Sequence, residues 1–206
     1  MPPVKKKIQT AVVRHKGDKG FSKRFERALL YAARLHAKQF RKGTNRLYVG
    51  HLLAVASIVV QFGGDEDMAI AALLHDAVED QGGLPRLREI QRKFGKRVAR
   101  IVDGCTDAYV EPKLPWLQRK REYLNRVADA PADVQLVSAA DKLANARDIL
   151  QDVRSGGPGV FERFNGKVDG TLWYYRSIVQ EFRKAGHKDL VEELDRVVTA
   201  LEMLAR

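Results

Sequence analysis

The stretch AALLHDAVEDQ, residues 71–81, decides the fold, because it begins as an apolar helical segment and then carries four ionisable side chains within six residues. These side chains belong to His75, Asp76, Glu79 and Asp80. Their spacings of three and four residues place them on adjacent parts of one helix surface. The apolar turns directly before them predict that this end of the helix is inserted into the protein, where an unpaired carboxylate is costly. A bound metal ion would offset that cost.

Length and composition predict one globular domain with a substantial core. The chain has 206 residues, of which 45% are hydrophobic and 31% are charged, and length alone allows two domains at most. We expect neither a membrane span nor a secretory signal, because the sequence has no long apolar run and no charged leader followed by an apolar segment. A single cysteine, Cys105, excludes an internal disulfide framework and a Cys-rich zinc site, and it fits a cytoplasmic protein.

The positive charge is concentrated at the N-terminus. The formal net charge is +11, and residues 1–24 hold eight Lys or Arg against a single acid, Asp18. We interpret residues 1–20 as a basic flexible arm and residues 21–206 as one folded domain. The arm's expected role is solubility or weak anion contact, so we regard nucleic acid as an unlikely partner except weakly through this segment.

Helical periodicity continues through the folded part. Apolar residues recur at spacings of three and four, and Gly or Pro separates the segments. No stretch alternates long enough to predict a strand, and there is no internal repeat. The fold class is therefore all-α, with about eight to ten helices. Helices are expected at 22–39, 51–62, 65–80, 84–94, 96–106, 115–129, 131–150, 167–184 and 187–204.

A metal site needs more ligands than His75 and Asp76 supply. His51 opens a helix whose neighbours face the core, and Asp141 is an isolated acid on an otherwise apolar helical face. Each has a structural explanation when taken alone, since a histidine at a helix start is often a cap and Asp141 has basic neighbours. Taken together, they predict three helices that converge on a mixed nitrogen and oxygen site, which suits Mn²⁺, Fe²⁺ or Zn²⁺ better than Mg²⁺.

Four blocks of this sequence resemble one family. They are LHAKQFRKGTNRLYVGHLLAVASIV, AALLHDAVEDQ, FGKRVARIVDGCTD and AADKLANARDIL. In this order they are similar to the RelA/SpoT-type hydrolase domain of the HD superfamily, and especially to the stand-alone small alarmone hydrolases that include the metazoan SpoT homologue. The resemblance covers residues 21–150 and extends more loosely over the last two helices.

The resemblance implies a fold, a reaction and a set of site residues. The fold would be the all-α HD-superfamily metal-dependent phosphohydrolase domain, and the reaction would remove the 3′-pyrophosphate from ppGpp or pppGpp with one Mn²⁺ ion, other divalent metals remaining possible. Glu79 and Asp80 would position or activate the attacking water. Arg41 and Lys42 would meet the base and pyrophosphate, and Asn145 would approach the ribose. The implied metal ligands are His51, His75, Asp76 and Asp141.

The sequence also departs from the family pattern. Trp116 stands where the metazoan homologue has a phosphate-facing lysine, for which Lys120 or Arg119 would have to substitute, and Ala144 stands where His or Tyr is common. Lys167 is a weaker candidate for phosphate contact. These changes leave the nucleotide base, the number of phosphates, the physiological metal and the oligomeric state open.

Two other functions stay open at this level. The same metal site would serve a hydrolase of another nucleotide, such as ppApp or NADPH. Alternatively, the chain is a catalytically inactive nucleotide-binding or RNA-binding module, with residues 1–24 supplying the affinity. Retention of all four implied ligands together with Glu79 and Asp80 favours an enzyme, because a phosphate binder gains nothing from carboxylates that repel phosphate.

Overall fold

The computed structural model describes residues 20–107, 114–184 and 186–205, and within them all regular structure is helical apart from one isolated β-bridge. The predicted all-α class is confirmed. In chain order the helices are α1 (Lys23–Leu35), α2 (Val49–Gln61), α3 (Glu66–Leu74), α4 (Ala77–Asp80), α5 (Gly83–Phe94), α6 (Lys96–Cys105), α7 (Trp116–Ala128), α8 (Ala132–Gly156), the 3₁₀ helix η1 (Pro158–Arg163), α9 (Lys167–Arg183) and α10 (Lys188–Leu204).

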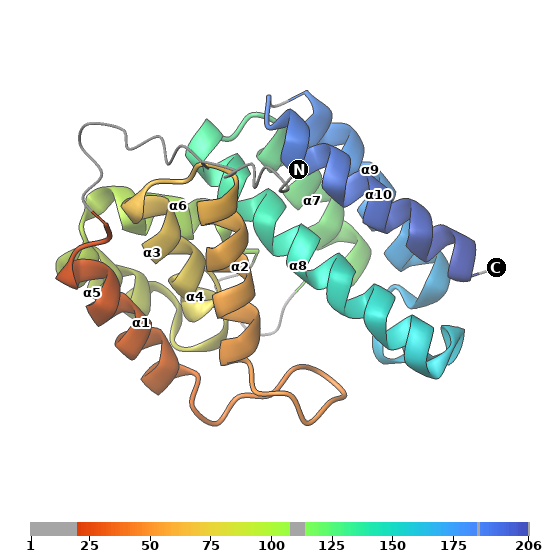
Figure 1. The fold of residues 1–206 in the computed structure, drawn as a ribbon, viewed down its shortest axis with the longest axis horizontal. Coiled ribbons are helices and arrows are strands. Elements are labelled where there is room, and N and C mark those ends of the chain that lie inside the picture. Colours follow the sequence, from red (N-terminus) through yellow and green to blue (C-terminus); the bar gives the residue numbers. More distant parts are fainter. Residues whose placement is uncertain (1–19, 108–113, 185, 206) are drawn as a thin grey trace, which may run out of the picture.

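Helix α8 is the centre of the fold (Figure 1). It contacts α2, α3 and α6 from the N-terminal half of the chain, and α7, η1, α9 and α10 from the C-terminal half. This long helix is buried on several sides, since its sequence is rich in Ala, Val and Leu. The core that surrounds it includes fully buried Leu73, Ile101, Leu143 and Ile178. Any polar side chain that α8 points inward therefore meets residues from both halves.

Two helix starts confirm the predicted caps. The Ser22 hydroxyl accepts a hydrogen bond from the backbone N–H of Arg24, and the Asp65 carboxylate accepts one from the N–H of Met68. The expected extension of the first helix to residue 39 was wrong. The Tyr48 N–H donates to the Gln39 carbonyl, and a bridge pairs Phe40 with Leu47. Residues 39–48 thus form an irregular hairpin loop instead of further helix.

The expected continuous helix over 65–80 was also wrong. It is interrupted at His75 and Asp76, which separate α3 from α4, and Asp76 has φ −94° and ψ −2°. This backbone lies at the bridge between the helical and extended regions, which is often found at active sites. The His75 ring also bonds the Ala72 carbonyl through Nδ1, at 2.8 Å. The ionisable cluster therefore lies on a turn between two helices rather than on one continuous helix face.

The C-terminal half differs from expectation in the ends of its helices and in one short helix that was not predicted. Helix α8 runs six residues past the predicted end at 150, to Gly156, and Gly157 stops it with a φ of 73° that favours glycine. The 3₁₀ helix η1 follows, with Phe161 fully buried. None of the helices in the described ranges is long and apolar enough to cross a membrane. The predicted basic arm falls mainly on residues 1–19, outside the described part of the chain.

Candidate metal centre and nucleotide pocket

Three pieces of the fold bring the four predicted metal ligands together. His51 comes from the first turn of α2, His75 and Asp76 from the turn between α3 and α4, and Asp141 from the middle of α8. The Nε2 atom of His51 lies 3.2 Å from Asp141 Oδ1 and 3.6 Å from Asp76 Oδ2. The Nε2 atom of His75 lies 2.9 Å from Asp76 Oδ2 and 3.4 Å from Asp141 Oδ1.

The donor set suits a metal ion. His51, His75 and Asp141 are buried, and one ligand atom from each lies within 4.8 Å of the others. Within the described residues, the Nε2 atoms of both histidines are buried and make no hydrogen bond. Two imidazole nitrogens and two carboxylates that converge in this way form a mixed set appropriate to a divalent transition metal.

The ionised carboxylates at this centre favour the binding of a cation. Burial by itself would lower the pKa of His75, but the carboxylates of Asp76 and Asp141 raise that pKa well above its usual value. Burial would likewise raise the pKa of Asp141, yet Lys142 and the two histidines hold it well below its usual range. The carboxylates thus remain ionised and attract positive charge, which a metal ion supplies together with coordination.

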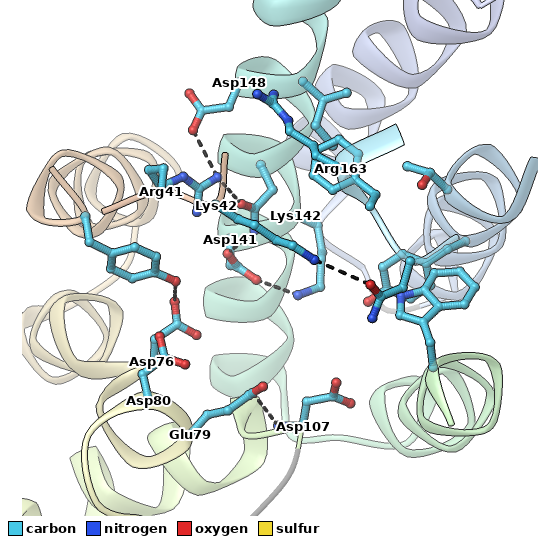
Figure 2. A pocket seen from close by; sticks show the side chains of 18 of the residues that line it. Arg41, Lys42, Asp76, Glu79, Asp80, Asp107, Asp141, Lys142, Asp148 and Arg163 are labelled. Carbon is cyan, nitrogen blue, oxygen red and sulfur yellow. Dashed lines mark hydrogen bonds and ion pairs between the residues drawn. The ribbon is translucent and has the colours of Figure 1, made fainter. Parts of the chain in front are cut away.

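A pocket of about 490 Å³ opens beside this centre, and Figure 2 shows 18 of the side chains that line it. Glu79 and Asp80, the predicted catalytic carboxylates, come from α4 and line the pocket with Asp76. The carboxylate of Glu79 accepts a hydrogen bond from the backbone N–H of Asp107 at 3.4 Å. Two acids therefore stand next to the metal ligands, where a water molecule and a substrate have access.

Gln39 holds the Asp80 carboxylate, a contact that sequence reasoning missed. The Gln39 amide nitrogen donates to Asp80 Oδ2 at 2.7 Å, while its oxygen accepts from the Gln81 amide and lies against His36 Nδ1, both at 2.7 Å. The Asp80 oxygen accepts this hydrogen bond, so the NH₂ group of Gln39 faces Asp80. Gln39 Oε1 then requires a proton on His36 Nδ1, and the network has a single consistent orientation.

Tyr48 is the second residue that sequence reasoning missed. Its hydroxyl donates to Asp76 Oδ2 at 2.5 Å, and its ring stacks on His36 with the ring centroids 5.5 Å apart. Burial and the nearby acids raise the pKa of Tyr48 far above its usual value, so the phenol keeps its proton as a donor. A signal was available, because Tyr48 precedes His51 by three residues and so shares a face with it at the start of α2.

The three predicted nucleotide contacts also lie at the pocket. Arg41 donates to Asn145 Oδ1 at 2.6 Å, and the Asn145 amide donates to Asp141 Oδ1 at 2.6 Å. This chain of bonds connects the hairpin loop to the metal centre. Lys42 extends across the pocket toward Asn165, with a separation of 3.4 Å between the Lys42 Nζ and Asn165 Oδ1 atoms (Figure 2). The nucleotide-binding roles themselves stay predictions.

Trp116, which stands where the metazoan homologue has a lysine, packs at the wall of the pocket. A Cβ atom on Gly166 would lie 2.7 Å from the indole and one on Gly170 would lie 3.2 Å from it, so the two glycines leave room for this ring. Of the two predicted substitutes for the missing lysine, Lys120 donates to Asp107 at 3.0 Å and Arg119 bonds the same carboxylate. Both line the pocket, as Glu79 does.

An all-α domain in which two buried histidines meet two aspartates that line a polar pocket defines a metal-binding helical domain of the hydrolase type. The family model described as HD domain matches residues 28–169, and the chain belongs to the HD domain family. The predicted superfamily is therefore confirmed.

Curated relatives support the same assignment. The chain is 39% identical over 129 residues to the guanosine-3′,5′-bis(diphosphate) 3′-pyrophosphohydrolase MESH1 of Xenopus tropicalis, a match that spans 61% of this chain and 69% of the relative. It is 34% identical over 138 residues to the enzyme of the same name from Drosophila melanogaster, a match that spans 66% of this chain and 74% of that relative.

Solved structures agree with the sequence relatives. One is described as a metazoan ortholog of SpoT that hydrolyzes ppGpp, and it superposes with a TM-score of 0.73 at 28% identity, covering 88% of this chain and 97% of its own. A crystal structure of a Listeria monocytogenes EGD-e protein superposes with a TM-score of 0.65 at 27% identity, covering 75% of this chain and 98% of its own. The arrangement of helices is thus shared with both of these proteins.

Proposed function

We propose that this chain is a metal-dependent pyrophosphohydrolase that removes the 3′-pyrophosphate from guanosine alarmones, converting ppGpp or pppGpp into GDP or GTP and pyrophosphate. The observation that carries the proposal is the convergence of His51, His75, Asp76 and Asp141 beside a pocket lined by both carboxylates and cations. Relatives named as 3′-pyrophosphohydrolases of this nucleotide match across the same segment.

We propose Mn²⁺ as the ion, held by the four converging side chains. Two imidazoles and two carboxylates fit Mn²⁺ and also Fe²⁺ or Zn²⁺, whereas Mg²⁺ is bound mainly by oxygen. When bound, the ion supplies Lewis acidity toward a phosphoryl oxygen. Tyr48 and Asn145 orient the two carboxylate ligands through the bonds described above. These outer contacts keep Asp76 and Asp141 directed at the centre.

Glu79 and Asp80 handle the proton of the attacking water in this proposal. The water oxygen forms a bond to the phosphorus next to the ribose 3′ oxygen, and the bond between that phosphorus and the 3′ oxygen breaks. One proton of the water passes to a carboxylate and then to the 3′ oxygen as it leaves. Gln39 keeps Asp80 in one orientation for this transfer, and the N–H of Asp107 does the same for Glu79.

Cationic side chains bind the rest of the nucleotide. Arg41 lies over the Tyr48 ring at 5.5 Å and contacts the base, Lys42 contacts the pyrophosphate, and Asn145 approaches the ribose. Lys120 and Arg119 also line the pocket and offset negative charge on the pyrophosphoryl group as water attacks it. The partner is therefore a small-molecule nucleotide, and we propose a cytoplasmic enzyme.

The test is product analysis. Purified protein is incubated with Mn²⁺ and, in turn, ppGpp, pppGpp, ppApp and NADPH, with Asp76→Ala as the inactive comparison. Release of pyrophosphate and GDP from ppGpp by the wild type alone supports the proposal. Faster turnover of ppApp or NADPH would reassign the substrate, and binding of nucleotide or RNA without turnover would identify a binding module.

A further inference from the structure

Two arginines in the pocket share one carboxylate. Arg46 from the hairpin loop donates to Asp152 Oδ2 at 2.7 Å, and Arg163 from η1 bonds the same oxygen. We call Arg46, Asp152 and Arg163 the Asp152 cluster. All three residues line the pocket, and none of them is among the predicted metal, catalytic or nucleotide-binding residues.

The Asp152 cluster has surplus positive charge and unused donor capacity. Two guanidinium groups face one carboxylate, and the nearest further acid on α8, Asp148, is bonded by Arg41 at 3.0 Å. Among the described residues, Arg163 Nε is buried without a hydrogen-bond partner. Guanidinium groups have several donors in a planar fork that matches phosphate oxygens. The cluster therefore has the charge and the donors for an additional anion.

The cluster lies at a useful place relative to the metal centre. Asp141, Asn145, Asp148 and Asp152 follow one another along α8 at intervals of three or four residues, so they lie along one side of the helix. The rise along the helix from Asp141 to Asp152 is about 16 Å, and the arginine side chains reach back into the pocket. Asn145, the expected ribose contact, stands between the two ends.

A nucleotide that carries phosphates at both the 3′ and the 5′ position of its ribose matches this arrangement. Its 3′-diphosphate would lie at the metal centre, its ribose near Asn145 and its 5′-phosphates beyond. We propose that Arg46 and Arg163 form a subsite for the 5′-phosphate groups of the nucleotide. The inference rests on the proposed function, and it adds a reason for the enzyme to prefer substrates that carry a 5′-diphosphate or 5′-triphosphate.

The loop geometry supports the subsite. Gly43 has a φ of 69°, and a Cβ atom there would lie 3.1 Å from Arg163 Cδ. The hairpin loop therefore makes close contact with the Arg163 side chain and fixes its stem against the loop. Arg46 has 40% of its side chain exposed and Arg163 has 21%, so both heads remain within reach of a ligand in the pocket.

The test compares three substrates that differ only at the 5′ position. Each is a guanosine 3′-diphosphate, and the 5′ group is a diphosphate, a monophosphate or a hydroxyl. We expect the Arg46→Gln/Arg163→Gln double variant to lower kcat/KM for the 5′-diphosphate substrate by about tenfold or more, mainly through KM. The 5′-hydroxyl substrate should change less than about twofold, because it makes no contact with the cluster.

Two further variants separate binding from a structural role. Asp152→Asn removes the carboxylate that competes for the two arginines, so it should raise the affinity for the 5′-diphosphate substrate. If the cluster were purely structural, the same change would lower that affinity. Arg147→Gln is the matched control, since Arg147 is on α8 but bonds Glu193 of α10 instead of the pocket.

An equal loss for all three substrates in the double variant would overturn the subsite and assign the cluster to loop anchoring. A wild type that cleaves all three substrates equally well would also overturn it while the proposed function stands. A wild type that cleaves none of the three would overturn both.

Discussion

Asp141 is the residue on which the metal centre depends most. It faces both histidines, accepts a hydrogen bond from the Asn145 amide and pairs with the half-buried Lys142. A single carboxylate therefore joins the metal site, the nucleotide contacts and the charge balance of α8.

Asp141→Asn should lower the affinity for Mn²⁺ by about 100-fold or more, because loss of even an outer contact to a metal ligand typically costs 10 to 100-fold. The helical circular dichroism spectrum should be retained, since the amide fills the same space. Titration calorimetry measures the affinity. The exposed Asp129→Asn is the control, and full metal affinity in Asp141→Asn would remove Asp141 from the ligand set.

Gln39 acts on the reaction through Asp80. Gln39→Leu should lower kcat by about tenfold, the effect of losing one hydrogen bond to a charged group, while KM changes less than about twofold. Steady-state kinetics with ppGpp gives both values. Lys38→Ala, which alters an exposed neighbour, should leave both unchanged. If KM rises and kcat does not fall in Gln39→Leu, the amide serves binding or packing instead of orientation.

At the scale of elements, the interruption between α3 and α4 creates the site. A straight helix would direct His75 and Asp76 about 100° apart around its axis. The turn instead brings His75 Nε2 to within 2.9 Å of Asp76 Oδ2. The short α4 then directs Glu79 and Asp80 into the same pocket.

The packing of α2 against α3 depends on a glycine between them. A Cβ atom on Gly64 would lie 2.4 Å from Val59 Cγ1 and 2.8 Å from the Val59 carbonyl oxygen. Gly64→Ala should therefore destabilise the fold by about 1–3 kcal/mol, as measured by chemical denaturation. Gly50→Ala has open space and a helical position, so it should be neutral or stabilising by up to about 1 kcal/mol. Equal stability of the two variants would show that the α2–α3 connection adjusts freely.

At the scale of the whole molecule, the site and the basic arm are separate in sequence. The predicted and proposed metal, catalytic and nucleotide-binding residues, with the weaker candidate Lys167 included, lie between 41 and 167. A variant that lacks residues 1–19 should therefore keep its kcat/KM for ppGpp within about twofold. Its binding to single-stranded RNA should weaken and depend less steeply on salt, because fewer cations remain to release counterions. Loss of turnover on deletion would place part of the arm in the catalytic domain.

The sequence by itself determined the helical class, the approximate helices and the residues that could form a metal site. These follow from local patterns, since apolar periodicity reports which side of a segment faces the core and an ionisable residue on that side stands out. The spacing within HDAVED and the isolated Asp141 were visible for this reason.

Only the tertiary structure decided how those residues meet. The break at His75, the bond from Gln39 to Asp80 and the pairing of Arg46 and Arg163 with Asp152 depend on how separate elements pack. Arg46 and Arg163 lie far apart in the chain, and no local pattern couples them. They share the Asp152 carboxylate because α8 packs against elements from both halves of the chain.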